Sequence, residues 1–386
     1  MWAGACVSSI GTWMQKVAQS WLVLSITGSP FYLGLDAFLG ELPILLFTLL
    51  GGVVADRHSR RAILLVSQCV QLSTAFALAA LVHWQVIQVW HVLALSFITG
   101  TAQAFGGPAY QSLLPTLVRK EDVPNAIALN STQFNIARIA GPTLAALTLA
   151  VWGSAACFAL NGVSFLFVIA SLLALRTVQL LPARTGTTVL AEMKSGLAYF
   201  RQSRLMLTIT FLALCTTMLA SPVLTLLPVM AQKVFRMDAA GYAWLMAFSG
   251  AGAVVGGLSV AWMGRFPRMG TTVLNVQMLL GLVLAAFASS RVLPLSYGLL
   301  FVGSIGLMMS FSLLMSLMQL AAPDHLRGRV MSIYMMAFRG GMPLGSLIAG
   351  YAASVTSAPA TLAVAGYLLT VVAALFMWRG KTVKEF

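Results

Sequence analysis

Five ionisable side chains stand inside long apolar stretches of this sequence, and their chemistry is the first feature that needs an explanation. They are Lys16, Asp36, Glu41, Arg138 and Arg339. In apolar surroundings a carboxylate can bind and release a proton, and a lysine or arginine can bind an anionic group. Because ionisable groups inside a bilayer are costly, they are usually functional or paired with one another.

The elements that carry these residues are predicted to be membrane-spanning helices. Of the 386 residues, 59% are hydrophobic and 8% are charged, and the mean hydropathy is +0.91. A soluble domain of this length could not bury so much apolar surface. A spanning helix needs about 20 apolar residues, and the sequence contains twelve such runs. They cover residues 2–27, 32–55, 62–84, 89–113, 126–151, 153–175, 205–232, 239–263, 270–290, 295–320, 328–354 and 357–378.

Counting along the helices gives the depth of each ionisable group. At about 1.5 Å per residue, Lys16 lies roughly 17 Å and Glu41 roughly 14 Å from the same membrane surface. Arg138 and Arg339 lie roughly 20 Å and 17 Å from the opposite surface, so they stand near the middle of a hydrocarbon layer of about 30 Å. Asp36 is only about one turn deep. Since a short turn joins the helices of Lys16 and Glu41, we expect these two side chains to face each other.

The net charge of +14 reflects membrane topology rather than nucleic-acid binding. Seventeen of the 23 basic residues lie in alternate loops or at the C-terminus, whereas the opposite loops hold only Lys233, Arg236 and Arg291. Basic residues concentrate in cytoplasmic loops. The bias therefore predicts that both termini are cytoplasmic. The chain opens directly into its first apolar run without a positively charged segment, so we expect no signal peptide.

A charged turn separates the second and third runs, at residues 52–61, with the sequence GVVADRHSRR. It resembles the loop between helices 2 and 3 of the major facilitator superfamily, with Ser59 where that family usually has glycine. The resemblance implies a conformational gating loop, in which the aspartate braces neighbouring helix ends and the arginines keep the loop cytoplasmic. The implied gating residues are Gly52, Asp56, Arg57, Arg60 and Arg61. A simple positive-inside turn would explain the arginines, but not the spacing of Gly52 and Asp56.

The two halves of the chain repeat one polar stripe at an offset of 201 residues. One copy consists of Ser131, Asn135, Arg138 and Pro142, and the other of Ser332, Met336, Arg339 and Pro343. We therefore expect two six-helix bundles, at residues 1–175 and 205–386, joined by a cytoplasmic linker at 176–204. Such a duplicated bundle places its binding site between the halves, near the bilayer midplane. Gly141, Pro142 and Pro343 are the expected hinges.

A longer pattern resembles one branch of that superfamily, the enterobactin-exporter-like or transmembrane secretion effector family. It runs from Ala104 to Pro142 and returns at residues 323–332. The resemblance implies the major facilitator fold, transport and export. Gly141 and Pro142 also resemble the antiporter signature of helix 5, although Ala145 and Ala146 replace its usual glycines, so antiport is suggested.

Each polar residue inside the membrane also has a structural interpretation. Lys16 and Glu41 could form a static ion pair as readily as they could take part in transport, and Arg138 could be an interdomain strut or a substrate contact. Arg339 favours a role in the cavity. Three further polar residues are candidates for substrate binding or proton coupling: Gln15 and Gln19, which extend the polar face of their helix, and Asn135. Asn161 is expected to form a hydrogen bond between helices.

Together these features predict an all-α membrane protein of twelve helices in two pseudo-symmetric bundles. We expect a monomeric, proton-coupled exporter of a small amphipathic or anionic molecule, such as a siderophore, in the plasma (inner) membrane. Glu41 is the first candidate for the proton carrier and Asp36 the second. The alternatives are a multidrug pump, a metabolite importer, and a non-transporting sensor or scaffold. The scattered cysteines and histidines form no catalytic or metal-binding motif, so neither an enzyme nor a cofactor is expected.

Overall fold

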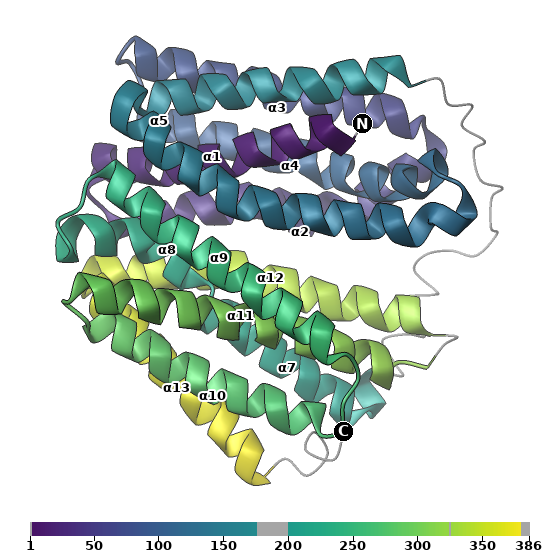
Figure 1. Cartoon of the computed structure of the whole chain (residues 1–386), viewed down its shortest axis with the longest axis vertical. Coiled ribbons are helices and arrows are strands. Elements are labelled where there is room, and N and C mark those ends of the chain that lie inside the picture. The colour runs from purple at the N-terminus through teal and green to yellow at the C-terminus, as the bar shows by residue number, and fades with distance from the viewer. Residues whose placement is uncertain (1, 176–199, 324–325, 380–386) are drawn as a thin grey trace. The chain divides into compact units, whose positions relative to one another are not determined.

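The computed structural model describes residues 2–175, 200–323 and 326–379, and every regular element in these ranges is helical (Figure 1). Most of the linker expected at 176–204 lies outside the described residues. The long helices are α1 (Trp2–Thr27), α2 (Pro30–Arg57), α3 (Arg60–His83), α4 (Val89–Leu113), α5 (Val123–Ala174), α7 (Arg204–Leu219), α9 (Ala239–Met263), α10 (Met269–Ser289), α11 (Leu293–Ala321), α12 (Arg327–Val355) and α13 (Ala358–Arg379). Shorter elements are η1 (Leu114–Leu117), η2 (Lys120–Asp122), α8 (Pro222–Val229) and the π-helix η3 (Met230–Val234).

Helix α5 is two membrane crossings joined at Gly153. Its 52 residues would extend about 80 Å as one straight helix, far more than a hydrocarbon layer of about 30 Å. Gly153 has φ 73° and ψ −173°, a backbone conformation that essentially only glycine adopts. This turn separates the runs predicted at 126–151 and 153–175, so the sequence located both crossings.

The run predicted at 205–232 is not one continuous helix. It divides into α7, α8 and the π-helix η3, with the first interruption at Ala220 and Ser221. Pro222 and Pro228 explain the irregular backbone, because a proline ring removes a hydrogen-bond donor and clashes with the preceding turn. The other predicted runs end within about three residues of the helices in the structure, a normal uncertainty for helix ends.

The chain divides into two compact units. In the described residues, the first unit contains 2–175 together with 231–247, and the second contains 200–230 together with 248–379. Within the first unit, α1 packs against α5 and α2 packs against α4, while α3 contacts both α4 and α5. Within the second unit, α10 lies between α11 and α13, and α7 contacts α11 and α12. Each unit is therefore a helical bundle with its own interior.

Each bundle has a buried apolar cluster. In the first unit the cluster joins four helices close to the loop between α2 and α3, and it consists of Ala55, Leu64, Ala109, Leu113, Val168 and Leu172. In the second unit a larger cluster joins α7, α10, α11 and α12, with Tyr334 fully buried in it. The first cluster fixes the helix ends that surround the charged loop.

Eight segments within the described ranges are long and apolar enough to cross a membrane by length and composition alone. Among the long helices, α1, α4 and α12 are not in this set. Two of these three helices carry candidate site residues, with Lys16 on α1 and Arg339 on α12.

Candidate functional site

Asp36 on α2 is the centre of a hydrogen-bonded group from three helices. The side chain is only 9% exposed. The Gln19 amide, from α1, donates to both carboxylate oxygens of Asp36, at 3.0 and 2.9 Å, and to the Ser96 hydroxyl oxygen at 2.9 Å. The Ser96 hydroxyl, from α4, donates to one Asp36 oxygen at 2.5 Å. This short contact is typical of a hydroxyl bonded to a carboxylate.

The surroundings of Asp36 suit reversible protonation. Among the described residues, Asp36 forms no ion pair, and its hydrogen-bond donors are the neutral groups of Gln19 and Ser96. A carboxylate removed from water is expensive unless it is paired, and it can become neutral by binding a proton. A cation in direct contact would hold the carboxyl group in its charged form. The two neutral donors stabilise that form less strongly, so the carboxyl group can still bind a proton.

Lys16 and Glu41 do not make the direct contact expected from their matched depths. In the part of the chain that the structure describes, neither residue forms an ion pair. Glu41 is half-buried on α2, and Lys16 is exposed on α1, within electrostatic range of Asp36. At 3.6 residues per turn, Glu41 is rotated by roughly 140° around α2 from Asp36. Lys16 and Glu41 therefore lie at similar depth, but Glu41 is not on the face of α2 that carries Asp36.

Trp13 on α1 has two cations close to its ring. The Lys16 ammonium nitrogen lies 5.5 Å from the centre of the Trp13 ring, and the Arg138 guanidinium carbon lies 5.8 Å from it. The Trp13 and Phe134 rings pack edge to face, with 6.0 Å between ring centres. Both cations are within the range of a cation–π interaction. The sequence argument identified both cations but missed the tryptophan, which stands three residues before Lys16 and thus on a neighbouring face of α1.

Gly141 makes the contact between Trp13 and Arg138 possible. A β-carbon at position 141 would lie 2.4 Å from the Trp13 β-carbon and 2.9 Å from the Ile10 carbonyl oxygen. Only glycine permits α5 to approach α1 this closely, and Arg138 lies one turn earlier on the same helix. Gly141 and the neighbouring Pro142 are both buried. Close helix packing is therefore observed at this pair, and their role as a hinge stays a prediction.

Two further polar contacts hold α1 against α5. The Asn161 amide donates to the Gln15 amide oxygen at 2.6 Å, which confirms the helix-packing bond expected for Asn161. The Gln133 amide donates to the Ser9 hydroxyl at 2.8 Å and to the Ala5 carbonyl at 3.1 Å. Gln15 is thus a packing residue, whereas Gln19 belongs to the Asp36 group.

The remaining candidates lie apart from these contacts. Asn135 is half-buried on α5. Arg339 is exposed on α12, and Pro343 is buried one turn further along the same helix. The role of Arg339 in a cavity and the hinge role of Pro343 stay predictions.

The charged loop between α2 and α3 is anchored by its arginines. Ser59 caps α3 by accepting a hydrogen bond from the Ala62 amide at 3.3 Å. The Arg60 guanidinium donates to the Ser112 carbonyl in the last turn of α4 at 3.0 Å, and Arg61 donates to the Leu173 carbonyl near the end of α5 at 2.8 Å. A cation at the C-terminal end of a helix satisfies free carbonyl groups and complements the helix dipole.

Asp56 and Arg57, in contrast, are exposed at the end of α2. Asp56 forms no ion pair or hydrogen bond through its side chain within the described ranges, so the arginines, rather than the aspartate, brace the neighbouring helix ends there. The tightly packed glycine is Gly51, where a β-carbon would lie 2.3 Å from the Ala104 carbonyl oxygen, whereas Gly52 faces open space.

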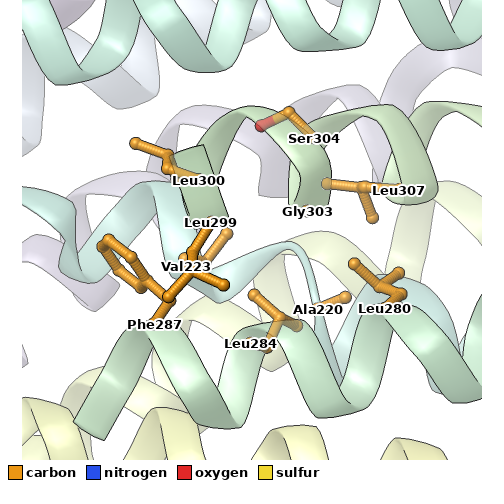
Figure 2. A pocket seen from close by; sticks show the side chains of 10 residues that line it. All are labelled: Ala220, Val223, Leu280, Leu284, Phe287, Leu299, Leu300, Gly303, Ser304 and Leu307. Atoms are coloured by element: carbon orange, nitrogen blue, oxygen red, sulfur yellow. The ribbon is translucent and has the colours of Figure 1, made fainter. Parts of the chain in front are cut away.

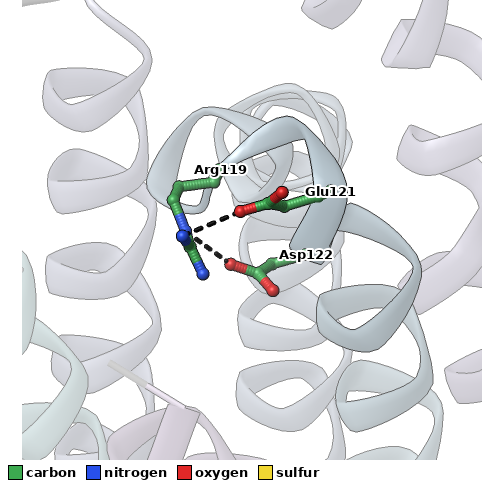
Figure 3. A network of polar contacts seen from close by, with 3 residues as sticks. All are labelled: Arg119, Glu121 and Asp122. Atoms are coloured by element: carbon green, nitrogen blue, oxygen red, sulfur yellow. Dashed lines mark hydrogen bonds and ion pairs between the residues drawn. The ribbon is translucent and has the colours of Figure 1, made fainter.

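Two other features are secondary to the site. Arg119 forms an exposed fork with Glu121 at 2.8 Å and Asp122 at 3.0 Å, between α4 and α5 (Figure 3). Exposed ion pairs of this kind contribute at most about 1 kcal/mol, so the fork has a local structural role. The second unit contains a small apolar pocket beside α8, α10 and α11 (Figure 2). Ser304 is its one polar side chain, and that hydroxyl is hydrogen-bonded to Ser249 at 2.7 Å.

Known proteins similar to this chain are transporters and efflux proteins. Macrolide efflux protein A of Streptococcus pyogenes is 24% identical over 361 residues, covering 90% of this chain and 87% of the relative. The multidrug efflux pump Tap of Mycolicibacterium fortuitum is 27% identical, covering 92% and 89%. The staphyloferrin A transporter of Staphylococcus aureus is 24% identical, covering 97% and 94%.

Solved structures show the same fold. A bacterial homologue of the human lysosomal transporter Spinster, in an inward-facing conformation, matches with a TM-score of 0.77 at 13% identity and covers 99% of this chain and 96% of its own. The nucleoside transporter NupG matches with a TM-score of 0.70 at 15% identity and covers 98% of both chains. The family described as transmembrane secretion effectors matches residues 1–384. The chain therefore belongs to this family of the major facilitator superfamily, and it is a multi-pass membrane transporter rather than an enzyme.

Proposed function

We propose that this transporter exports a small amphipathic anion from the cytoplasm by alternating access, in exchange for protons. The three relatives named above support export, since two are efflux proteins and the third transports a siderophore. The distribution of basic residues supports a plasma-membrane protein with both termini in the cytoplasm. The charged loop between α2 and α3 would then lie on the cytoplasmic side.

The observation that carries the proposal is the buried carboxyl group of Asp36, bonded to Gln19 and Ser96. Binding of a proton to one Asp36 oxygen removes the negative charge and converts that oxygen into a donor. When the proton binds Oδ1, the oxygen that accepts from Ser96, the Ser96 hydroxyl must find another acceptor, and the Gln19 amide can turn its oxygen toward the new O–H group. Protonation thus changes the contacts among three helices, which is what coupling a proton to a conformational change requires.

Asp36 replaces Glu41 as the first candidate for the proton carrier. Asp36 is more buried, and its hydrogen-bond partners come from two other helices, whereas the Glu41 side chain has no such partners among the described residues. Glu41 remains the second candidate because a carboxylate at its expected depth is costly. Lys16 and Arg138 would supply positive charge for an anionic substrate, as would Arg339 on α12.

A multidrug pump is the second candidate function, favoured by the similarity to Tap. The two functions differ in the charge of the molecule that is carried. An exporter of anions needs the positive charges of Lys16 on α1 and Arg138 on α5. A pump for cationic drugs would transport its substrate best when neutral residues replace these two.

Proton movement in proteoliposomes tests the proposal. The wild-type protein is reconstituted with a pH-sensitive dye inside, an outward or inward pH gradient is imposed, and staphyloferrin A or a macrolide is added. The account predicts that an accepted probe accelerates the collapse of the pH gradient in wild type and not in Asp36→Asn. Asp238→Asn is the matched control, because Asp238 is exposed and caps the Gly241 amide, a role that asparagine can also fill. Probe movement without proton movement in the wild type would contradict proton coupling.

A further inference from the structure

We propose that Trp13, Lys16 and Arg138 form a subsite for the anionic group of the transported molecule. The inference rests on the proposed function for the identity of the cargo, although binding at this subsite needs no proton gradient. Two cations lie close to the Trp13 indole ring, with the Lys16 ammonium at 5.5 Å and the Arg138 guanidinium at 5.8 Å from the ring centre.

Two like charges beside one ring repel each other, and the repulsion is strong where water is scarce. The nearest acids do not neutralise Lys16 by direct contact. Asp36 is bonded to Gln19 and Ser96, and within the described ranges Lys16 forms no ion pair. Both cations lie within 6 Å of the same ring centre, so an anion bound at Lys16 would also be attracted by Arg138. The side chain of Lys16 is exposed, so the neighbouring helices leave room beside it for a ligand.

Trp13 is the positioning residue of this subsite. The Phe134 ring packs edge to face with it at 6.0 Å between ring centres, and Gly141 packs against its β-carbon, so the indole cannot easily move away from either cation. The negative face of an indole attracts cations and so holds both close to the ring. If the ring were replaced by an aliphatic side chain, the flexible lysine would be free to move into water.

The same residues indicate the chemical class of the ligand. A carboxylate or phenolate oxygen suits the ammonium and the guanidinium, and the guanidinium can bind two oxygens of one carboxylate. The exposed Phe134 ring beside Trp13 offers an apolar surface for the body of the ligand. The expected ligand is therefore a planar or aromatic carboxylate, rather than a cation or a neutral sugar.

The test measures equilibrium binding of three probes that share one ring system. Purified protein in a neutral detergent is dialysed against 1-naphthoate, 1-naphthamide or 1-naphthylmethylammonium, with binding to empty micelles subtracted. We expect naphthoate to bind more tightly than the other two. We expect Lys16→Gln to weaken naphthoate binding about tenfold, as for one lost charge-assisted contact, and to leave naphthamide unchanged.

The variants of Trp13 separate positioning from folding. Trp13→Leu is expected to weaken naphthoate selectively, and Trp13→Phe to restore part of the loss, because the smaller ring still attracts a cation. Trp262→Leu and Lys120→Gln are the matched controls, since both wild-type side chains are exposed and neither belongs to the site. Each variant is compared only where its elution from size-exclusion chromatography matches wild type, and Lys16→Arg provides a second, charge-preserving variant that should keep tight binding.

Equal binding of naphthoate and naphthamide to wild type, or an equal loss of both in Lys16→Gln, would overturn the subsite. This failure is distinct from failure of the proposed function. Selective naphthoate binding without proton-coupled movement would support the subsite and contradict proton coupling. Proton-coupled movement of a cationic probe without naphthoate binding would support proton coupling and contradict the subsite.

Discussion

The Gln19 amide donates to both carboxylate oxygens of Asp36, at 3.0 and 2.9 Å, and so joins α1 to α2 through a buried acid. The Ser96 hydroxyl adds α4 to the same group at 2.5 Å. Contacts of this kind depend on the charge state of the carboxyl group, because a carboxylate only accepts hydrogen bonds whereas a carboxylic acid also donates one. A proton bound at Asp36 would therefore change contacts among three helices at once.

Ser96→Ala should destabilise the protein by about 1–3 kcal/mol, because the buried carboxylate loses a hydrogen-bond donor that nothing replaces. Thermal unfolding in detergent measures the effect. Ser73→Ala is the control, since Ser73 is exposed on α3. If both variants unfold at the same temperature, the bond between Ser96 and Asp36 contributes nothing to stability.

The sequence located the helices well because hydropathy runs and bilayer thickness constrain the same quantity, the length of a spanning segment. It even placed the turn at Gly153, where glycine interrupts a long apolar stretch. It missed the interruption at Ala220, because the prolines that follow lie inside an apolar run that continues through them.

The site was less predictable because sequence position fixes depth but not rotation. Glu41 and Lys16 were matched in depth, yet Asp36 is the acid that bonds with α1. Ser96 and Trp13 were missed since a lone serine or tryptophan in an apolar helix is usually a packing residue. Only the positions of neighbouring helices distinguish such residues from members of a site.

Gly141→Ala should destabilise the first bundle by about 1–3 kcal/mol, because the added methyl group must fit against the Trp13 β-carbon, 2.4 Å away. Gly107→Ala is the matched control: Gly107 is also helical, and a β-carbon there would meet nothing within 4 Å. Thermal unfolding of the two variants should differ clearly. A tolerated Gly141→Ala would mean that α1 and α5 can separate freely at this point.

Asp56→Asn should insert and fold normally but move little substrate. Asp56 is exposed and lacks a side-chain partner in the described residues, so the change in stability should stay within about 0.5 kcal/mol. Arg60→Ala, in contrast, should lower stability, because it removes the bond to the Ser112 carbonyl. Expression, unfolding temperature and efflux of the accepted probe are measured together for both. Wild-type efflux in Asp56→Asn would remove the gating role of the loop aspartate.

Arg138→Gln and Arg339→Gln should have different consequences. Arg138 packs over Trp13, so its loss should weaken both anion binding and the packing of α1 against α5. Arg339 is exposed on α12, so its loss should leave stability unchanged and weaken transport of an anionic probe more than that of a neutral one. Equal transport losses for the two probes in Arg339→Gln would favour a structural role, and no loss for either would refute a role in binding.

The most direct test of proton coupling at Asp36 compares two modes of transport in one variant. Proteoliposomes containing Asp36→Asn are assayed for accumulation of the accepted probe against its gradient, driven by a pH gradient, and for exchange of labelled against unlabelled probe at equal pH. Exchange needs the carrier to bind and reorient, whereas accumulation also needs the proton. The account predicts that Asp36→Asn keeps exchange and loses accumulation. Accumulation at the wild-type level in Asp36→Asn would contradict it.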